Sequence, residues 1–142
     1  MPRRKKTPAR GLADPTPLEL EVMQILWERG DATAAEVGGA LARRALADTT
    51  IHTVLANLRR KGYVAPVPTI ERALRFAPAV PRERVASRSL RRLLAEFFDG
   101  SPRRLMAHLV QEERVDAREL AEIRKLLKSQ LAAPPGQKES KP

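Results

Sequence analysis

Two copies of one helix-start signal, Thr-x-x-Glu, divide the first half of the chain into short helices. Thr16 and Glu19 form the first copy, and Thr33 and Glu36 form the second. In such a capping box each of the two side chains accepts a hydrogen bond from the backbone N–H of the other residue, which fixes where a helix begins. Gly30 predicts the end of the first helix. The sequence therefore predicts two helices in close succession.

A third helix is predicted by the segment DTTIHTVLANLRRKGYV, residues 48–64. Its apolar side chains recur at helical spacing along one stripe. We expect Asp48 to cap this helix and Gly62 to end it. The stripe consists of Ile51, Val54, Leu55 and Leu58. The opposite side carries Thr49, Thr53, Ala56, Asn57 and Arg60, flanked by Thr50, His52, Arg59 and Lys61. Small hydrogen-bonding residues thus come first and cations last.

A short hairpin is expected after the third helix. Residues 63–67 and 72–77 have the composition of strands, and residues 68–71 form the turn between them. Leu74 and Phe76 would share one face of the second strand, with Arg75 on the other. Pro66 and Pro68 restrict the pairing at the outer end of the hairpin. In the second helix, Gly38 and Gly39 are expected where a neighbouring backbone approaches closely.

The pattern after Pro81 is helical throughout, with Asp99-Gly100, Ser101-Pro102 and Asp116 marking helix ends and starts. The apolar stripes of these helices are too wide to be covered by one small domain of about 65 residues. We therefore expect residues 81–131 to form a dimerisation arm, although the arm could instead fold back on its own chain. The expected interface consists of Leu90, Leu93, Leu94, Phe97, Leu105, Leu109, Leu120, Ile123 and Leu127.

Composition narrows the classes of function. The chain has no cysteine, which excludes disulfides and thiolate metal sites, and its two histidines are too few for a convincing metal cluster, so no metal or other cofactor is expected. We expect His52 to be an exposed residue or a DNA contact rather than a pH or metal switch, and His108 to be an interface residue rather than a ligand. No apolar run is long enough to cross a membrane and no signal peptide is evident, which favours a cytoplasmic protein. The catalytic motifs of common enzymes are absent, so an enzyme is not expected.

The net charge of +10 indicates a polyanionic partner, but the charge is uneven. Residues 16–80 hold eight basic and seven acidic groups, whereas residues 1–15 hold five basic groups and one acidic group. The proline-rich ends, residues 1–15 and 132–142, are expected to be disordered tails. The basic N-terminal tail could add affinity for a polyanion without sequence preference, or only keep the protein soluble.

Three short helices followed by a hairpin are the layout of a winged helix-turn-helix, here residues 16–80. The third helix of that fold enters the major groove of double-stranded DNA, and the hairpin contacts the backbone beside it. A narrow, polar front half fits the groove, and cations at the far end fit phosphates. The expected DNA-binding residues are Thr49, Thr50, His52, Thr53, Asn57, Arg59, Arg60, Lys61, Arg72 and Arg75. The fold class is mainly α with a small β-hairpin.

Residues 18–37 and 50–62 resemble the penicillinase-repressor family (BlaI/MecI), which includes the copper-responsive CopY branch. The first segment matches the family's Glu-x-x-[Val/Ile]-Met-x-x-x-Trp helix through Glu19, Val22, Met23 and Trp27. The second matches Thr-[Val/Ile]-x-Thr-x-[Leu/Ile] and Leu-x-x-Lys-Gly through Thr50, Ile51, Thr53, Leu55, Leu58, Lys61 and Gly62. The C-terminal helices resemble the family's dimerisation arm.

This resemblance implies a homodimeric repressor that binds a palindromic operator and blocks transcription. Two family features do not carry over. Asn57 stands where the family usually has Arg, and the arm reads Ala107-His108-Leu109 where a membrane sensor-protease cuts an Asn-Phe bond in penicillinase repressors. The cysteine-rich tail of the copper branch is also absent. An alternative function is that of a basic helical adaptor or ribosome-associated protein without sequence-specific DNA binding.

Overall fold

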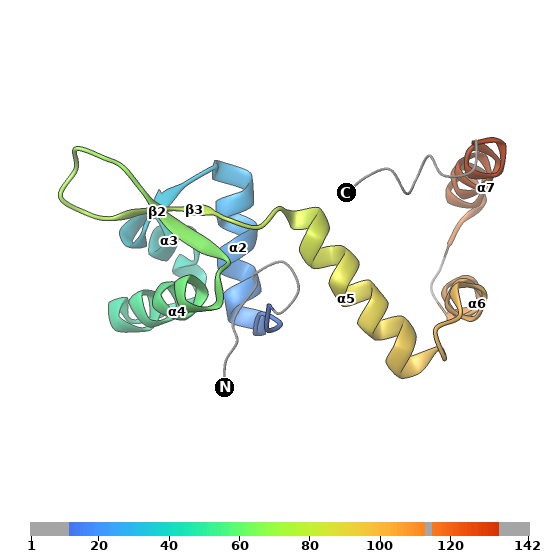
Figure 1. Cartoon of the computed structure of the whole chain (residues 1–142), viewed down its shortest axis with the longest axis horizontal. Helices are drawn as coiled ribbons and strands as arrows, with labels where there is room; N and C mark the ends of the chain where they lie inside the picture. Colours follow the sequence, from blue (N-terminus) through green and yellow to red (C-terminus); the bar gives the residue numbers. More distant parts are fainter. Residues whose placement is uncertain (1–11, 113–114, 134–142) are drawn as a thin grey trace, which may run out of the picture. The chain divides into compact units, whose positions relative to one another are not determined.

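The computed structural model describes residues 12–112 and 115–133. These residues belong to two compact units that divide between Leu90 and Arg91. The expected tails therefore lie largely outside the described residues. Leu12 was expected to belong to the disordered N-terminal tail, but it is buried in the core, with its Cδ2 3.3 Å from the position that a Cβ on Gly62 would take. Figure 1 labels the helices and strands. The elements of the first unit are α2 (Pro17–Arg29), β1 (Ala32–Thr33), α3 (Ala34–Ala40), a 3-10 turn (Ala42–Arg44), α4 (Asp48–Lys61), β2 (Val64–Val67) and β3 (Arg75–Pro78).

Both expected capping boxes are confirmed. Thr16 Oγ1 accepts from the Glu19 N–H at 3.2 Å and Glu19 Oε1 accepts from the Thr16 N–H at 2.9 Å. Thr33 and Glu36 form the same pair of bonds at the start of α3, each 3.1 Å long. Helix α2 ends at Gly30. The starts of α2 and α3 thus lie where local chemistry predicts them.

The start of α4 corrects one expectation. The N-cap is Ala47 and not Asp48, and no side chain caps the helix. Ala47 already has extended dihedral angles, φ −70° and ψ 152°, so Asp48 lies inside the first turn. A carboxylate in that position still interacts favourably with the helix dipole. The end of α4 is as expected, because Gly62 adopts the left-handed conformation with φ 91°.

The hairpin is shorter than expected and joins a third strand. β3 lies between β1 and β2, and both neighbours are antiparallel to it. β3 begins only at Arg75, where it pairs with Thr33 on one side and Val67 on the other. Leu74 therefore lies in the loop, exposed, and does not share a strand face with Phe76 as expected. Pro66 is tolerated because β2 is an edge strand.

The two adjacent glycines of α3 differ in how closely other atoms approach them. A Cβ on Gly38 would lie 3.8 Å from the side chain of Ile51 in α4, an ordinary contact, whereas a Cβ on Gly39 would meet nothing within 4 Å. The expected close approach of a neighbouring backbone is therefore wrong for Gly39, and the two helices meet through the side chain of Ile51.

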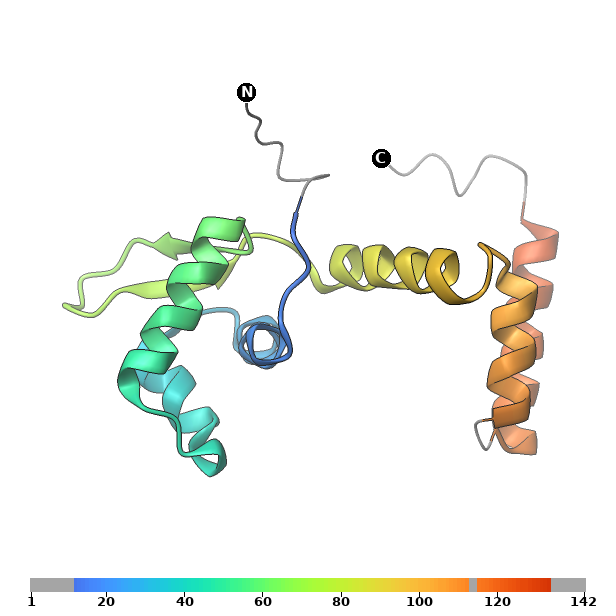
Figure 2. The same ribbon diagram turned by 90° about the horizontal axis from the view of Figure 1, so that it is seen from below.

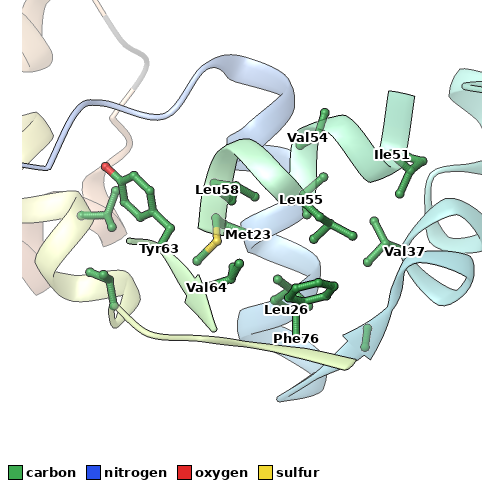
Figure 3. Packing of buried hydrophobic residues seen from close by; sticks show 14 of the residues in the cluster. Met23, Leu26, Val37, Ile51, Val54, Leu55, Leu58, Tyr63, Val64 and Phe76 are labelled. Carbon is green, nitrogen blue, oxygen red and sulfur yellow. The ribbon is translucent and has the colours of Figure 1, made fainter. Parts of the chain in front are cut away.

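The core of the first unit gathers side chains from every layer. Figure 3 shows Leu26 of α2 beside Phe76 of β3, and Met23 of α2 and Val37 of α3 belong to the same cluster. The stripe of α4 closes this core, because its four members are all buried; they are Ile51, Val54, Leu55 and Leu58. The stripe thereby fixes which side of α4 turns away from the protein.

Trp27 contacts the segment after β3 and holds it against this core. Its indole Nε1 donates to the carbonyl of Val80 at 2.9 Å, and the guanidinium of Arg82 lies 5.4 Å from the ring centre. The start of the next helix, α5 (Arg82–Phe97), is thus held against α2. Val85 in its first turns is buried as well.

The second unit contains the end of α5 together with α6 (Pro102–Glu112) and α7 (Ala117–Ala132). Ser101 and Asp116 begin α6 and α7 as expected, since their side chains accept from the N–H groups of Arg104 and Glu119. None of the described residues of α6 and α7 is fully buried. The apolar stripes of these helices are therefore at most half-buried in a single copy of the chain.

Candidate nucleic-acid interface

The side of α4 opposite its buried stripe is open to solvent. Thr49, Thr53, Ala56 and Arg60 are exposed along the centre of this side, and His52 and Arg59 are exposed along one flank. On the other flank Thr50 and Asn57 are half-buried. The first two turns of this surface carry hydroxyl and methyl groups, and its cations lie in the last turn. We refer to these eight residues as the α4 surface.

Asn57 and Arg60 form a pair within the α4 surface. The Arg60 guanidinium donates from Nη2 to Asn57 Oδ1 at 2.9 Å, across one turn of the helix. The bond leaves the other donors of the guanidinium available and restrains its orientation. Asn57 can therefore orient the guanidinium of Arg60. This contact was not predicted, although the three-residue spacing of the two polar residues could have indicated it.

Lys61 was expected to contact DNA, but its ammonium contacts groups of the protein itself. Its ammonium lies 2.7 Å from Glu19 Oε1 and 3.5 Å from the carbonyl oxygen of Asp14. The Glu19 side chain is only 4% exposed and that of Lys61 only 19%. The same Glu19 oxygen accepts from Thr16 in the capping box. Lys61 therefore neutralises a buried carboxylate and joins the end of α4 to the start of α2.

Arg75, which was also expected to contact DNA, forms ion pairs within the protein. Its guanidinium lies 2.6 Å from Asp31, 2.9 Å from Glu36 and 3.1 Å from Glu71. Hydrogen bonding to Glu71, and then the charges of Glu36, Glu71 and Asp31, raise the pKa of Arg75. The pKa of Glu36 is lowered, first by the backbone hydrogen bond from Thr33 and further by the charges of Arg75 and Arg29. Arg75 therefore ties β3 to the start of α3.

The loop between β2 and β3, residues 68–74, forms the tip of the wing. Figures 1 and 2 both show it extending beyond the three helices of the first unit. Arg72 is exposed there, as expected for a DNA contact, and Ile70 is fully exposed. A groove of about 750 Å³ separates the wing from α4, with Leu74 on one wall and Ala56 and Arg59 on the other. The α4 surface thus borders the same groove as Ala73 and Leu74, the two residues that follow Arg72 in the wing.

The expected interface residues of the arm fall into two groups. Leu94, Leu105 and Ile123 are half-buried. The other six are exposed, and they are Leu90, Leu93, Phe97, Leu109, Leu120 and Leu127. His108 contacts the ring of Phe98 edge to face, with 5.4 Å between ring centres.

Within residues 12–112 and 115–133, no three His, Asp or Glu side chains come together in a way that could hold a metal ion. No helix in that part of the chain has both the length and the apolar character needed to cross a membrane.

Comparisons with known proteins gave matches to a family model, to a curated protein and to solved structures. The family model described as penicillinase repressor matches residues 15–129. The transcriptional regulator BlaI of Mycobacterium tuberculosis is 39% identical over 113 residues, which cover 78% of this chain and 80% of that protein. The solution structure of the DNA-binding domain of the repressor BlaI is 26% identical, with a TM-score of 0.43, over 49% of this chain and 84% of that one. A mutant MarR from E. coli, solved in complex with operator DNA, is 19% identical, with a TM-score of 0.46, over 82% and 75% of the two chains.

The burial of Glu19 makes the role of Lys61 testable. Lys61→Met removes the cation and leaves Glu19 with one fewer partner, so it should lower the free energy of unfolding by about 1–3 kcal/mol in urea titrations. Arg59→Met changes an exposed neighbour and should alter stability by less than about 0.5 kcal/mol. Adding Glu19→Gln to Lys61→Met should recover part of the loss. Equal stability of the Lys61 and Arg59 variants would contradict this role of Lys61.

Proposed function

The chain belongs to the penicillinase-repressor family, and from that premise we propose that it represses transcription by binding a palindromic operator as a homodimer. Its DNA-binding part is the winged helix of residues 16–80. The observation that carries the proposal is the open α4 surface, because a helix can read DNA only if one of its sides is free of the protein's own atoms. The relative BlaI is a regulator from a bacterium, and an operator on bacterial DNA would place this protein in the cytoplasm as well.

The front of α4 is suited to the major groove. The groove is about 12 Å wide and admits a helix whose leading side chains are small. Thr49 and Thr53 offer a hydroxyl group that donates and accepts, and a methyl group that can contact a thymine methyl. Ala56 adds no bulk at the next position along the same side. We therefore assign base reading to the two exposed threonines, with Thr50 at the edge of the contact.

The cations of the α4 surface are suited to phosphates. Arg59 and Arg60 lie in the last turn, and His52 lies on the same flank as Arg59. Arg72 is exposed at the tip of the wing. Phosphate contacts fix the position of a protein on the duplex and carry no sequence information directly. Asn57 orients Arg60 through its hydrogen bond. Lys61 and Arg75 do not belong to these phosphate contacts. Their ion pairs hold α4 against α2 and β3 against α3.

The arm provides the symmetry that a palindrome requires. Phe97 is 71% exposed and Leu127 is 53% exposed in a single copy of the chain. Covering apolar surface contributes about 25 cal/mol per Å², so a second copy that presents the same stripes would stabilise both. A two-fold axis then places two α4 helices about 34 Å apart, or a multiple of that distance, along one side of the duplex.

We do not extend the family's cleavage-based induction to this chain. Residues 107–109 lie inside α6. Proteases cut most readily at exposed loop tips, where the backbone is not held in a helix.

Base reading and phosphate binding should respond differently to mutation. Thr53→Ala should weaken binding to the preferred operator by about 1–3 kcal/mol and leave binding to random DNA nearly unchanged. Arg60→Ala should weaken binding to both and flatten the slope of log K against log salt by about one. Fluorescence anisotropy over a salt series measures these effects. Equal losses on operator and random DNA from Thr53→Ala would contradict the assignment of α4 as the reading helix.

The dimer should depend on the arm's apolar stripes. Leu94→Asp or Leu127→Asp puts a charge into the proposed interface, so each should shift the protein to monomers in sedimentation velocity. Lys125→Asp is a suitable control, because this exposed residue of α7 lies on the side of the helix away from Leu127 and Leu120. Circular dichroism checks that each variant remains helical. Unchanged sedimentation of both leucine variants would exclude this dimer.

A further inference from the structure

The groove between α4 and the wing has the dimensions of a ligand site, and we call it the wing groove. Its volume is about 750 Å³. Small-molecule sites in proteins occupy about 300–1,000 Å³. Leu74 and Phe76 line the side formed by the wing and β3. The side formed by α4 is a stripe at helical spacing, made of His52, Leu55, Ala56, Arg59 and Arg60.

Most of the side chains that line the wing groove are apolar. Leu55 and Phe76 belong to the buried core (Figure 3) and reach the groove from there. Leu74 is 56% exposed on the wing side, and Ala56 is exposed on the α4 side. Removing apolar surface from water is favourable, so the groove favours an occupant with an apolar body.

The α4 side of the wing groove carries the charge. Arg59, Arg60 and His52 all lie there, and among the described residues that line the groove none is acidic. Arg60 uses Nη2 in its bond to Asn57, which leaves the other donors of that guanidinium available. A guanidinium binds a carboxylate through two parallel N–H···O bonds. The occupant is therefore expected to carry an anionic group on the side that faces α4.

Duplex DNA alone does not match both properties of the wing groove. Its phosphates are suited to the cations of α4, but a sugar-phosphate backbone offers little apolar surface to Ala56, Leu74 and Phe76. A small organic acid matches both, because its ring covers the apolar side chains while its carboxylate pairs with a guanidinium. Charge and apolar surface together favour such an acid as the occupant.

We propose that the wing groove binds a small aromatic carboxylic acid, whose carboxylate pairs with Arg59 and Arg60 and whose ring lies between Ala56 and Leu74. The site itself is independent of the proposed function. Its consequence rests on that function, because the same two guanidinium groups are assigned to phosphates. The acid and the operator then compete for the protein, and operator DNA weakens binding of the acid by the same factor. The acid is thus an inducer that releases the repressor from DNA.

A titration with phenylpropanoate, followed by nuclear magnetic resonance, tests the site in the absence of DNA. A ligand of this size is expected to bind with a Kd of about 0.1–3 mM. Propanoate, which lacks the ring, and phenylpropanol, which lacks the charge, should each bind about tenfold more weakly. The amide signals of Ala73 and Leu74 should shift, and those of α6 and α7 should not. Equal binding of phenylpropanoate and phenylpropanol would contradict the pairing with Arg59 and Arg60.

Two matched variants locate the site. Leu74→Ser removes apolar surface from the wing groove, whereas Ile70→Ser makes the same kind of change at a fully exposed residue of the wing. Leu74→Ser should weaken binding of phenylpropanoate about fivefold, because less apolar surface is covered, and Ile70→Ser should leave it unchanged. Neither residue is assigned to DNA, so both variants should keep the wild-type affinity for the operator when no acid is present. Circular dichroism checks that both remain folded.

Competition with DNA tests the consequence of acid binding. With phenylpropanoate at about ten times its Kd, the apparent Kd for the operator should rise about tenfold or more, because occupied protomers are withdrawn from DNA binding. Fluorescence anisotropy measures this rise, and propanoate at the same concentration controls for ionic strength. The rise should be smaller for Leu74→Ser than for the wild type or Ile70→Ser.

The outcomes separate this inference from the proposed function. Equal affinity of the wild type and Leu74→Ser for phenylpropanoate, or shifts confined to α6 and α7, would overturn the site. Binding in the wing groove that leaves operator affinity unchanged would overturn the inducer role. Loss of operator preference in the acid-free protein would instead overturn the proposed function and leave the site intact.

Discussion

Burial of the apolar stripe of α4 is the constraint on which the other features of the winged helix depend. Ile51, Val54, Leu55 and Leu58 pack against side chains from α2, α3 and the sheet, and the helix can satisfy all four contacts in only one rotation about its axis. That rotation turns Thr49 and Thr53 to solvent. A core interaction thus determines which residues are available to DNA, and no contact on the exposed side is needed to hold them there.

Ion pairs decide which cations belong to the candidate interface. Lys61 and Arg75 were expected to contact DNA because of their type and position in the sequence. In the structure Lys61 neutralises the buried Glu19, and Arg75 lies among three carboxylates. Both residues join elements that must keep a fixed relation to α4, namely α2 and the wing. A basic residue near a DNA-binding helix can therefore contribute by holding the helix in place.

Local features of this fold could be predicted from the sequence, and long-range ones could not. Some features depend only on residues within a few positions of each other, and these can be predicted from the sequence. They are the capping boxes at Thr16 and Thr33 and the left-handed conformation of Gly62. The pairing of β1 with β3 joins Ala32 to Phe76, and a two-residue strand has no pattern of its own. The carboxylates around Arg75 and the packing of Leu12 on Gly62 likewise arise only when distant segments meet. The α4 surface was predictable because a single periodic helix defines it.

The proposed function combines three elements that recognise DNA in different ways: the threonines of α4, the surrounding cations and the symmetry of the dimer. Selection of bound sites from random DNA with the purified protein tests their combination most directly. The account predicts an inverted repeat whose half-site centres are about 10 base pairs, or a multiple of that, apart. Recovery of sites with no shared motif, or of a single motif without two-fold symmetry, would contradict it.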